Sequence, residues 1–198
     1  MAGTPGSHID ALLRNTERYP RVFTAGELPV PPALRLAIVA CMDSRIDLFA
    51  LLGLHLGEAH VIRNAGGLVT DDVLRSLALS QSLLQTRETM VIQHTGCGLH
   101  GDEEHLRRRV AEATGAHPPW PLGAFDDVEA SVLRQLEILR SAPGLVEDQS
   151  ARGFVYEVET GRLREVGFYR DLSDAYVTQT ITPRYRIDAE GTAAGGQP

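Results

Sequence analysis

The stretch LAIVACMDSRID, residues 36–47, decides how this chain folds. Its first five residues are continuously apolar, which is typical of a strand buried on both faces of a parallel sheet. The apolar run ends at Cys41, and Asp43 and Arg45 follow directly. Ligands of open parallel sheets bind beyond the carboxyl ends of the strands. The stretch therefore predicts a buried strand that delivers polar side chains to a site.

A second apolar run, MVIQ at residues 90–93, is followed by His94 and then by Cys97. Cys41 and Cys97 are the only two cysteines of the chain. Thiolates and imidazoles are ligands of zinc, and three protein ligands leave one tetrahedral position open for water at a catalytic site. If the two strands are neighbours, both halves meet in one crevice. We interpret Cys41, His94 and Cys97 as the ligands of one zinc ion per chain.

Length and composition limit the other classes of function. A chain of 198 residues, 43% hydrophobic and 23% charged, predicts a single catalytic domain over 1–198 with its core at about 7–170. The Ala- and Gly-rich residues 189–198 predict a mobile tail. The net charge of -7 argues against a nucleic-acid partner. Without a membrane-length apolar run or a secretory signal, we expect a cytoplasmic protein with no membrane partner.

Strand and helix patterns alternate along the chain, which predicts an α/β fold. The expected strands are 36–40, 60–63 and 90–93, and the expected helices are a short one from Ser7, 46–54, 70–85, 102–113 and 126–141. A late hairpin, at 154–159 and 163–166, is expected to add antiparallel edge strands. We therefore predict a central, mostly parallel β-sheet flanked by helices. The glycine-rich loop at 64–67 is expected to pack against the site.

The motifs CMDSR at 41–45 and HTGCG at 94–98 resemble those of β-class carbonic anhydrases, especially the short prokaryotic branch. RNAGG at 63–67 also fits that family, and the resemblance covers roughly residues 9–166. It implies an enzyme that interconverts carbon dioxide and bicarbonate by attack of zinc-bound hydroxide. It also implies the β-carbonic anhydrase fold in a homodimer or dimer of dimers, with the N-terminal helix packed on the partner subunit.

The resemblance implies roles for individual residues. Cys41, His94 and Cys97 match the zinc ligands, and Asp43 and Arg45 match the catalytic pair. Asp43 would accept a hydrogen bond from the zinc-bound hydroxide, while Arg45 holds Asp43 ionised by a bidentate contact. If Arg45 releases it, Asp43 becomes a fourth zinc ligand and the enzyme is inactive, more readily at low pH.

The sequence departs from the family pattern at two positions. Gly96 stands where this branch usually has Asp, at a position that is not a ligand. Ile38 stands where some members carry a tryptophan of a noncatalytic bicarbonate site, so we expect no inhibition through that site. The proton must leave through a shuttle, and the sequence does not choose between His55, His60 and His100.

Other interpretations stay open at this point. Related enzymes of this branch hydrolyse carbon disulfide or carbonyl sulfide with the same nucleophile, and a long apolar tunnel would favour those substrates. A zinc-holding protein without activity is a third possibility. The two cysteines can also be plain core residues or a disulfide, and Asp43 with Arg45 a structural ion pair.

Overall fold

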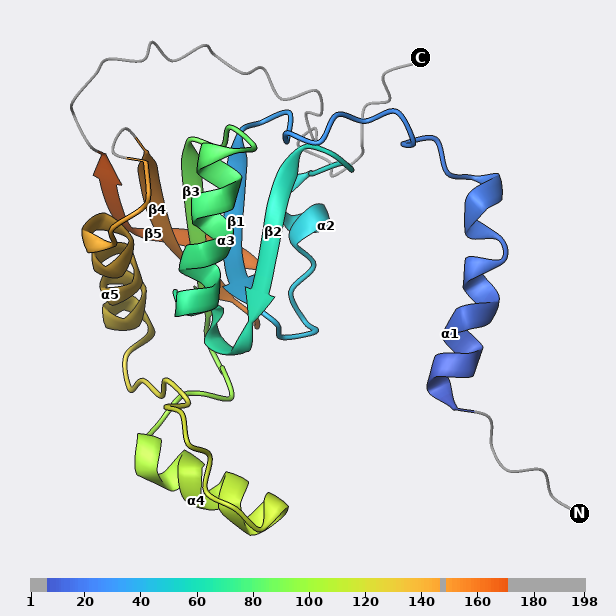
Figure 1. Ribbon diagram of the computed structural model, residues 1–198. Coiled ribbons are helices and arrows are strands. Elements are labelled where there is room, and N and C mark those ends of the chain that lie inside the picture. The colour runs from blue at the N-terminus through green and yellow to red at the C-terminus, as the bar shows by residue number, and fades with distance from the viewer. Residues whose placement is uncertain (1–6, 147–148, 171–198) are drawn as a thin grey trace, which may run out of the picture.

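The computed structural model describes residues 7–146 and 149–170, so the predicted mobile tail at 189–198 lies outside the described residues (Figure 1). A five-stranded sheet has the order β2-β1-β3-β4-β5. Its strands are β1 (Leu36–Cys41), β2 (Ala59–Asn64), β3 (Glu88–His94), β4 (Ser150–Glu157) and β5 (Arg162–Arg170). Neighbours pair in parallel except β4 with β5, which are antiparallel. The predicted α/β fold with an antiparallel edge pair is confirmed.

The late hairpin joins the sheet differently from the prediction in one respect. Its first strand, β4, pairs in parallel with β3, so only β5 runs against its neighbour. The reason lies in the connection from β3 to β4, which passes through two helices and is long enough to return the chain in the same direction. β4 and β5, by contrast, are joined by a short turn at residues 158–161.

Every helix that the sequence predicts is present, with small shifts at the ends. The helices are α1 (His8–Thr16), α2 (Leu48–Leu52), α3 (Asp71–Ser82), α4 (Glu103–Thr114) and α5 (Val128–Ser141), with 3-10 turns at Tyr19–Arg21 and Ala65–Gly67. Ser7 and Asp10 form a capping box at the start of α1. Gly53 adopts a left-handed conformation and ends α2. No helix of the described residues is long and apolar enough to cross a membrane.

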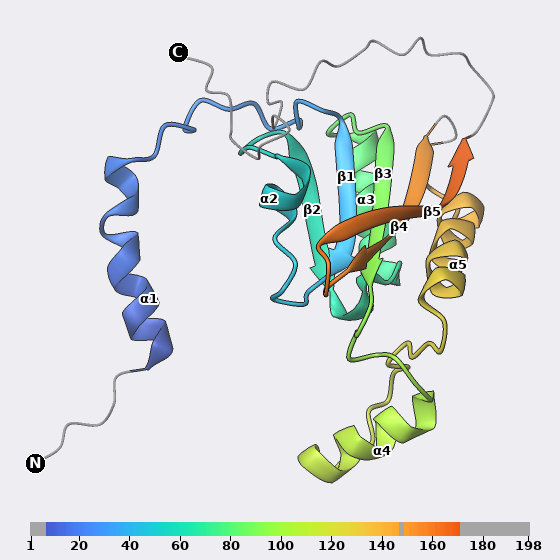
Figure 2. The ribbon, with the colours of Figure 1, turned by 180° about the vertical axis from the view of Figure 1, so that it is seen from behind.

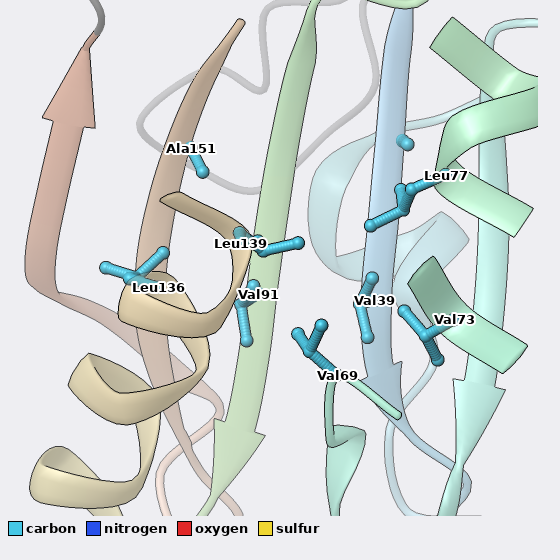
Figure 3. Close-up of a cluster of buried hydrophobic side chains, with 9 residues drawn as sticks. Val39, Val69, Val73, Leu77, Val91, Leu136, Leu139 and Ala151 are labelled. Atoms are coloured by element: carbon cyan, nitrogen blue, oxygen red, sulfur yellow. The ribbon is translucent and has the colours of Figure 1, made fainter. Parts of the chain in front are cut away.

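Apolar side chains cover both faces of the sheet. On one face, α3 and α5 pack against the strands (Figure 3) through Ala37, Val39, Val69, Val73, Leu77, Val91, Leu136, Leu139 and Ala151. On the opposite face, which Figure 2 shows with α2, the cluster includes Ile38, Ala40, Ile46, Leu48, Ile92 and Phe154. Residues 37–40 of β1 have no exposed surface, as predicted for a strand buried on both faces.

Helices α1 and α4 project away from the sheet (Figures 1 and 2). Neither helix contains a buried residue. The apolar stripe of α1 is largely exposed, at 67% for Ile9, 65% for Leu12 and 55% for Leu13. An apolar stripe of this kind is normally buried against another surface.

Candidate metal centre

The parallel pairing of β1 with β3 brings the two cysteine motifs together. Cys41 is the last residue of β1 and His94 is the last residue of β3. Cys97 follows from the turn after β3, and the ligand atoms of all three residues lie within 4.8 Å of one another. All three are buried, and the cysteines are free thiols rather than a disulfide. The structure thus assembles the three residues that the sequence singled out.

The two ring nitrogens of the His94 imidazole have different surroundings. Its Nδ1 lies 2.8 Å from the carbonyl oxygen of Thr95. A carbonyl only accepts, so Nδ1 carries the hydrogen and Nε2 keeps a lone pair. Nε2 is buried without a hydrogen-bond partner among the described residues. Because an unsatisfied buried acceptor costs about 1–3 kcal/mol, a cation at this point would stabilise the arrangement.

Cys41 and Cys97 shift each other's pKa in opposite directions. A hydrogen bond from Cys97 lowers the pKa of Cys41, against the opposing effect of burial, and the backbone amides of Asp43 and Gly66 add to the lowering. The same hydrogen bond, together with burial, raises the pKa of Cys97. Two sulfurs and one imidazole are a donor set that suits zinc. The residues therefore fit a metal ion whose binding displaces a proton.

Asp43 is held at the edge of this cluster by Arg45. The Nη2 of Arg45 donates to Asp43 Oδ2 at 2.6 Å, and its Nε donates to Oδ1 at 2.9 Å. The backbone N–H of Arg45 also donates to Oδ1, at 2.9 Å. These contacts hold the pKa of Asp43 well below its usual range. Asp43 Oδ2 lies 3.7 Å from His94 Nε2, so an ionised carboxylate faces the open side of the imidazole.

The loop after β2 packs against the site, as the sequence predicted. Arg63 donates to the carbonyl oxygens of Cys41 at 3.0 Å and Asp43 at 2.7 Å. Gly67 has a φ of +62°, and a Cβ there would lie 2.8 Å from both the Cys41 nitrogen and the Ile92 oxygen. A side chain at this position would push the loop away from the strand ends. Sequence reasoning missed the contacts of Arg63, although it noted the motif that contains it.

The three histidines named as shuttles differ in position. His60 lies near the start of β2, away from the strand ends, and its Nδ1 is 2.7 Å from Ser80 Oγ. His55 is exposed and precedes β2. His100 is exposed, and its backbone N–H donates to the carbonyl of Cys97 at 3.1 Å. His100 is thus bonded through its backbone to a residue of the cluster.

Comparison with known proteins identifies the family to which these motifs belong. The family model described as carbonic anhydrase matches residues 36–163. Beta-carbonic anhydrase 1 of Mycobacterium tuberculosis is 46% identical over 158 residues, which cover 79% of this chain and 96% of that protein. The chain belongs to the β-carbonic anhydrase family. A shorter match, over residues 146–185, is to the model of methylation-associated defense system protein MAD7.

Other known proteins resemble the chain in structure or in sequence. The crystal structure of carbonic anhydrase from Streptococcus mutans matches with a TM-score of 0.78 and 37% identity, covering 83% of this chain and all of that one. A carbon disulfide hydrolase of Acidithiobacillus thiooxidans is 34% identical over 174 residues, covering 77% of this chain and 87% of that protein. The carbonic anhydrases are thus the more similar of these relatives.

The two departures from the β-carbonic anhydrase pattern have simple structural settings. Gly96 adopts a φ of +62°, and its carbonyl accepts a hydrogen bond from Arg45 Nη2 at 3.0 Å. Glycine adopts this left-handed conformation at little cost. Ile38 is fully buried in the core on the α2 side of β1.

The cluster predicts that metal binding stabilises this β-carbonic anhydrase. Zinc at 100 times its Kd should raise the free energy of unfolding by about 2.7 kcal/mol. The gain should shrink as the pH falls, because protons compete for the sulfurs. Denaturant unfolding with zinc and with a chelator measures this, and Cys97→Ala should remove most of the gain. Identical unfolding curves with and without zinc would contradict the assignment.

Proposed function

We propose that this chain is a zinc-dependent carbonic anhydrase that catalyses the reversible hydration of carbon dioxide to bicarbonate and a proton. The observation that carries the proposal is the buried group of Cys41, His94 and Cys97 with the Asp43–Arg45 pair beside it. Family membership supports the same activity, since the relative with 46% identity is a β-carbonic anhydrase.

The three buried residues would hold one zinc ion per chain. A bound zinc ion lowers the pKa of a coordinated water and so supplies hydroxide near neutral pH. Cys41 would bind as a thiolate stabilised by the amides of Asp43 and Gly66. Cys97 would give up its proton on binding, and His94 would bind through Nε2 because its Nδ1 is committed to Thr95. Three protein ligands leave a fourth position for the reactants.

Asp43 and Arg45 would orient the attack. Asp43 stays ionised because Arg45 binds both carboxylate oxygens, and an ionised carboxylate only accepts hydrogen bonds. Asp43 Oδ2 faces the cluster and would accept the hydrogen bond of the hydroxide nucleophile, which aims a lone pair at the carbon of carbon dioxide. Arg45 would keep Asp43 in place while the new C–O bond of bicarbonate forms.

The proton of the attacking water must reach solvent. Of the histidines considered, His100 is exposed and follows Cys97 by three residues. Its backbone N–H donates to the carbonyl of Cys97 at 3.1 Å, which places the residue near the cluster in the chain. We propose that the His100 imidazole receives the proton on a ring nitrogen and releases it to buffer.

Hydrolysis of carbon disulfide is the alternative activity, and the relatives that carry that name support it. The same nucleophile would attack carbon disulfide or carbonyl sulfide. The higher identity to a carbonic anhydrase favours carbon dioxide. A zinc-holding protein without activity is less consistent with the intact pair of Asp43 and Arg45, which matches the catalytic pair of the family.

Replacing Asp43 tests the catalytic proposal. Asp43→Asn should lower kcat/KM for carbon dioxide hydration by roughly 10²- to 10³-fold, the range for loss of one positioned hydrogen-bond partner in an active site, while zinc stays bound. Stopped-flow assays with carbon dioxide and with carbon disulfide, together with zinc content, measure this. Asp47→Asn is the matched control, since Asp47 caps α2 and asparagine also caps helices. Full activity with bound zinc in Asp43→Asn would refute the proposed role.

We propose further that Asp43 can swing onto the metal and inactivate the enzyme. The low pKa of Asp43 keeps it ionised throughout the working range, so its own charge does not set the pH dependence. Hydroxide would compete with the carboxylate for the same position, and its concentration falls tenfold with each unit that the pH falls. Low pH therefore favours the carboxylate, and loss of Arg45 should favour it too.

Activity should accordingly decline toward acid pH, and Arg45→Gln should move the midpoint of this decline to higher pH. A pH profile of kcat/KM for both proteins measures the shift. Arg75→Gln, on an exposed ion pair of α3, is the control. A profile that is flat from acid to alkaline pH would argue against the switch.

We propose that the chain forms a homodimer, or a dimer of dimers, through α1. The support is the exposed stripe of Ile9, Leu12 and Leu13, which the described part of the chain does not cover. Leu12→Asp should yield a species near the 21.6 kDa of one chain, where the wild type has at least twice that mass. Sedimentation measures both, with Asn15→Asp as a control of equal charge. A wild type that sediments as a monomer at high concentration would rule the interface out.

We also propose that the whole chain is one catalytic domain that works in the cytoplasm. Two free thiols at the proposed metal site support a reducing compartment, because oxidation would remove both sulfur ligands at once. The continuous sheet, to which segments from β1 to β5 all contribute, supports one domain.

A further inference from the structure

Thr95, the residue after His94, is tied to the β4–β5 turn through both its backbone and its side chain. Its backbone N–H donates to the carbonyl of Tyr156 at 3.0 Å. Its Oγ1 donates to Glu159 Oε2 at 2.9 Å and accepts from the backbone N–H of Val158 at 3.1 Å. These partners lie more than 60 positions further along the chain. The turn therefore fixes the position of the Thr95 peptide.

The remaining polar group of Thr95 is its carbonyl, which accepts the Nδ1 hydrogen of His94 at 2.8 Å. That contact sets both the tautomer and the rotation of the imidazole. The β4–β5 turn reaches the end of the sheet at which β1 and β3 finish (Figure 2), and His94 lies opposite Tyr156 in the β3–β4 register. A continuous set of hydrogen bonds thus runs from Glu159 through Thr95 to His94.

We propose that Thr95 and Glu159 act as a positioning pair that aims Nε2 of His94 at the metal and so raises zinc affinity. The inference rests on the proposed function only in taking His94 as a zinc ligand. It gives the edge hairpin a role in the site, beyond completing the sheet. Partners in the second coordination sphere of histidine ligands typically contribute 10- to 100-fold to metal affinity.

The charge of Glu159 fits this role. The hydrogen bond from Thr95 holds the pKa of Glu159 below its ordinary value, so the carboxylate is ionised and accepts strongly. Arg45 lies near enough to contribute to the same lowering. On the other flank of the loop, Arg45 Nη2 donates to the carbonyl of Gly96 at 3.0 Å. The loop between His94 and Cys97 is therefore held from two sides by groups of opposite charge.

Zinc affinity of the purified full-length chain tests the pair, measured by competition with a chromophoric chelator. Thr95→Val keeps the shape of the side chain and removes the two hydrogen bonds of Oγ1. This variant should bind zinc 10- to 100-fold more weakly than the wild type. Thr95→Ser keeps the hydroxyl and should stay within about threefold of the wild type. Glu159→Gln keeps an acceptor without charge and should weaken binding, by less than Thr95→Val does.

Thr160→Val is the matched control, because Thr160 Oγ1 donates to Glu157 in the same turn without contacting the site. Its zinc affinity should equal that of the wild type. Equal affinities of Thr95→Val and Thr95→Ser, or an equal loss in Thr160→Val, would overturn the proposal. If Thr95→Val does not fold, the exposed Glu159→Gln decides alone, and an unchanged affinity there also overturns it.

The same preparations separate this inference from the proposed activity. Carbon dioxide turnover of the zinc-loaded wild type tests the activity, whereas the ratio of zinc affinities between variants tests the positioning pair. A wild type that binds zinc but does not hydrate carbon dioxide would refute the proposed activity. The ratio of zinc affinities between the variants and the wild type would still test the positioning pair. Normal turnover with unchanged ratios would refute the pair alone.

Discussion

Parallel pairing of β1 with β3 places the carboxyl ends of two buried strands side by side, and the rest of the site is built on this pairing. Cys41 and His94 each end one of these strands, so they meet without any long loop having to be ordered. The apolar side chains on both faces keep the strands in register. A shift of one residue would turn the ligands to opposite faces of the sheet.

The electrostatics of the cluster explain why hydrogen-bonding and charged groups lie around the strand ends. Two sulfurs and an imidazole that are buried together would be stabilised by a cation, since a buried thiolate is costly unless it is paired. Amides from Asp43 and Gly66 stabilise the Cys41 thiolate, and Arg63 fixes the carbonyls of Cys41 and Asp43. The protein's own hydrogen bonds therefore hold the backbone around the cluster, and they hold the ionised Asp43 where it can accept a hydrogen bond.

Much of this was predictable from sequence because the signals are local. A continuous apolar run followed by Cys41 indicates a buried strand with a candidate ligand at its end. The apolar run before His94 repeats this pattern. The parallel pairing of β4 was not predictable, because a hairpin pattern shows how two strands pair with each other and not which neighbour the first one joins. The contacts of Arg63 and of Thr95 with Glu159 join segments that only the tertiary fold brings together. The expected tail at 189–198 and the roles of individual site residues stay predictions.

X-ray absorption at the zinc edge of the purified protein tests the central claim most directly. The account predicts about one zinc per chain with two sulfur ligands at about 2.3 Å, one imidazole nitrogen at about 2.0–2.1 Å and one further light atom. A spectrum without sulfur ligands would contradict it. So would protein that contains no zinc after growth in ample metal, with Cys41 and Cys97 joined in a disulfide.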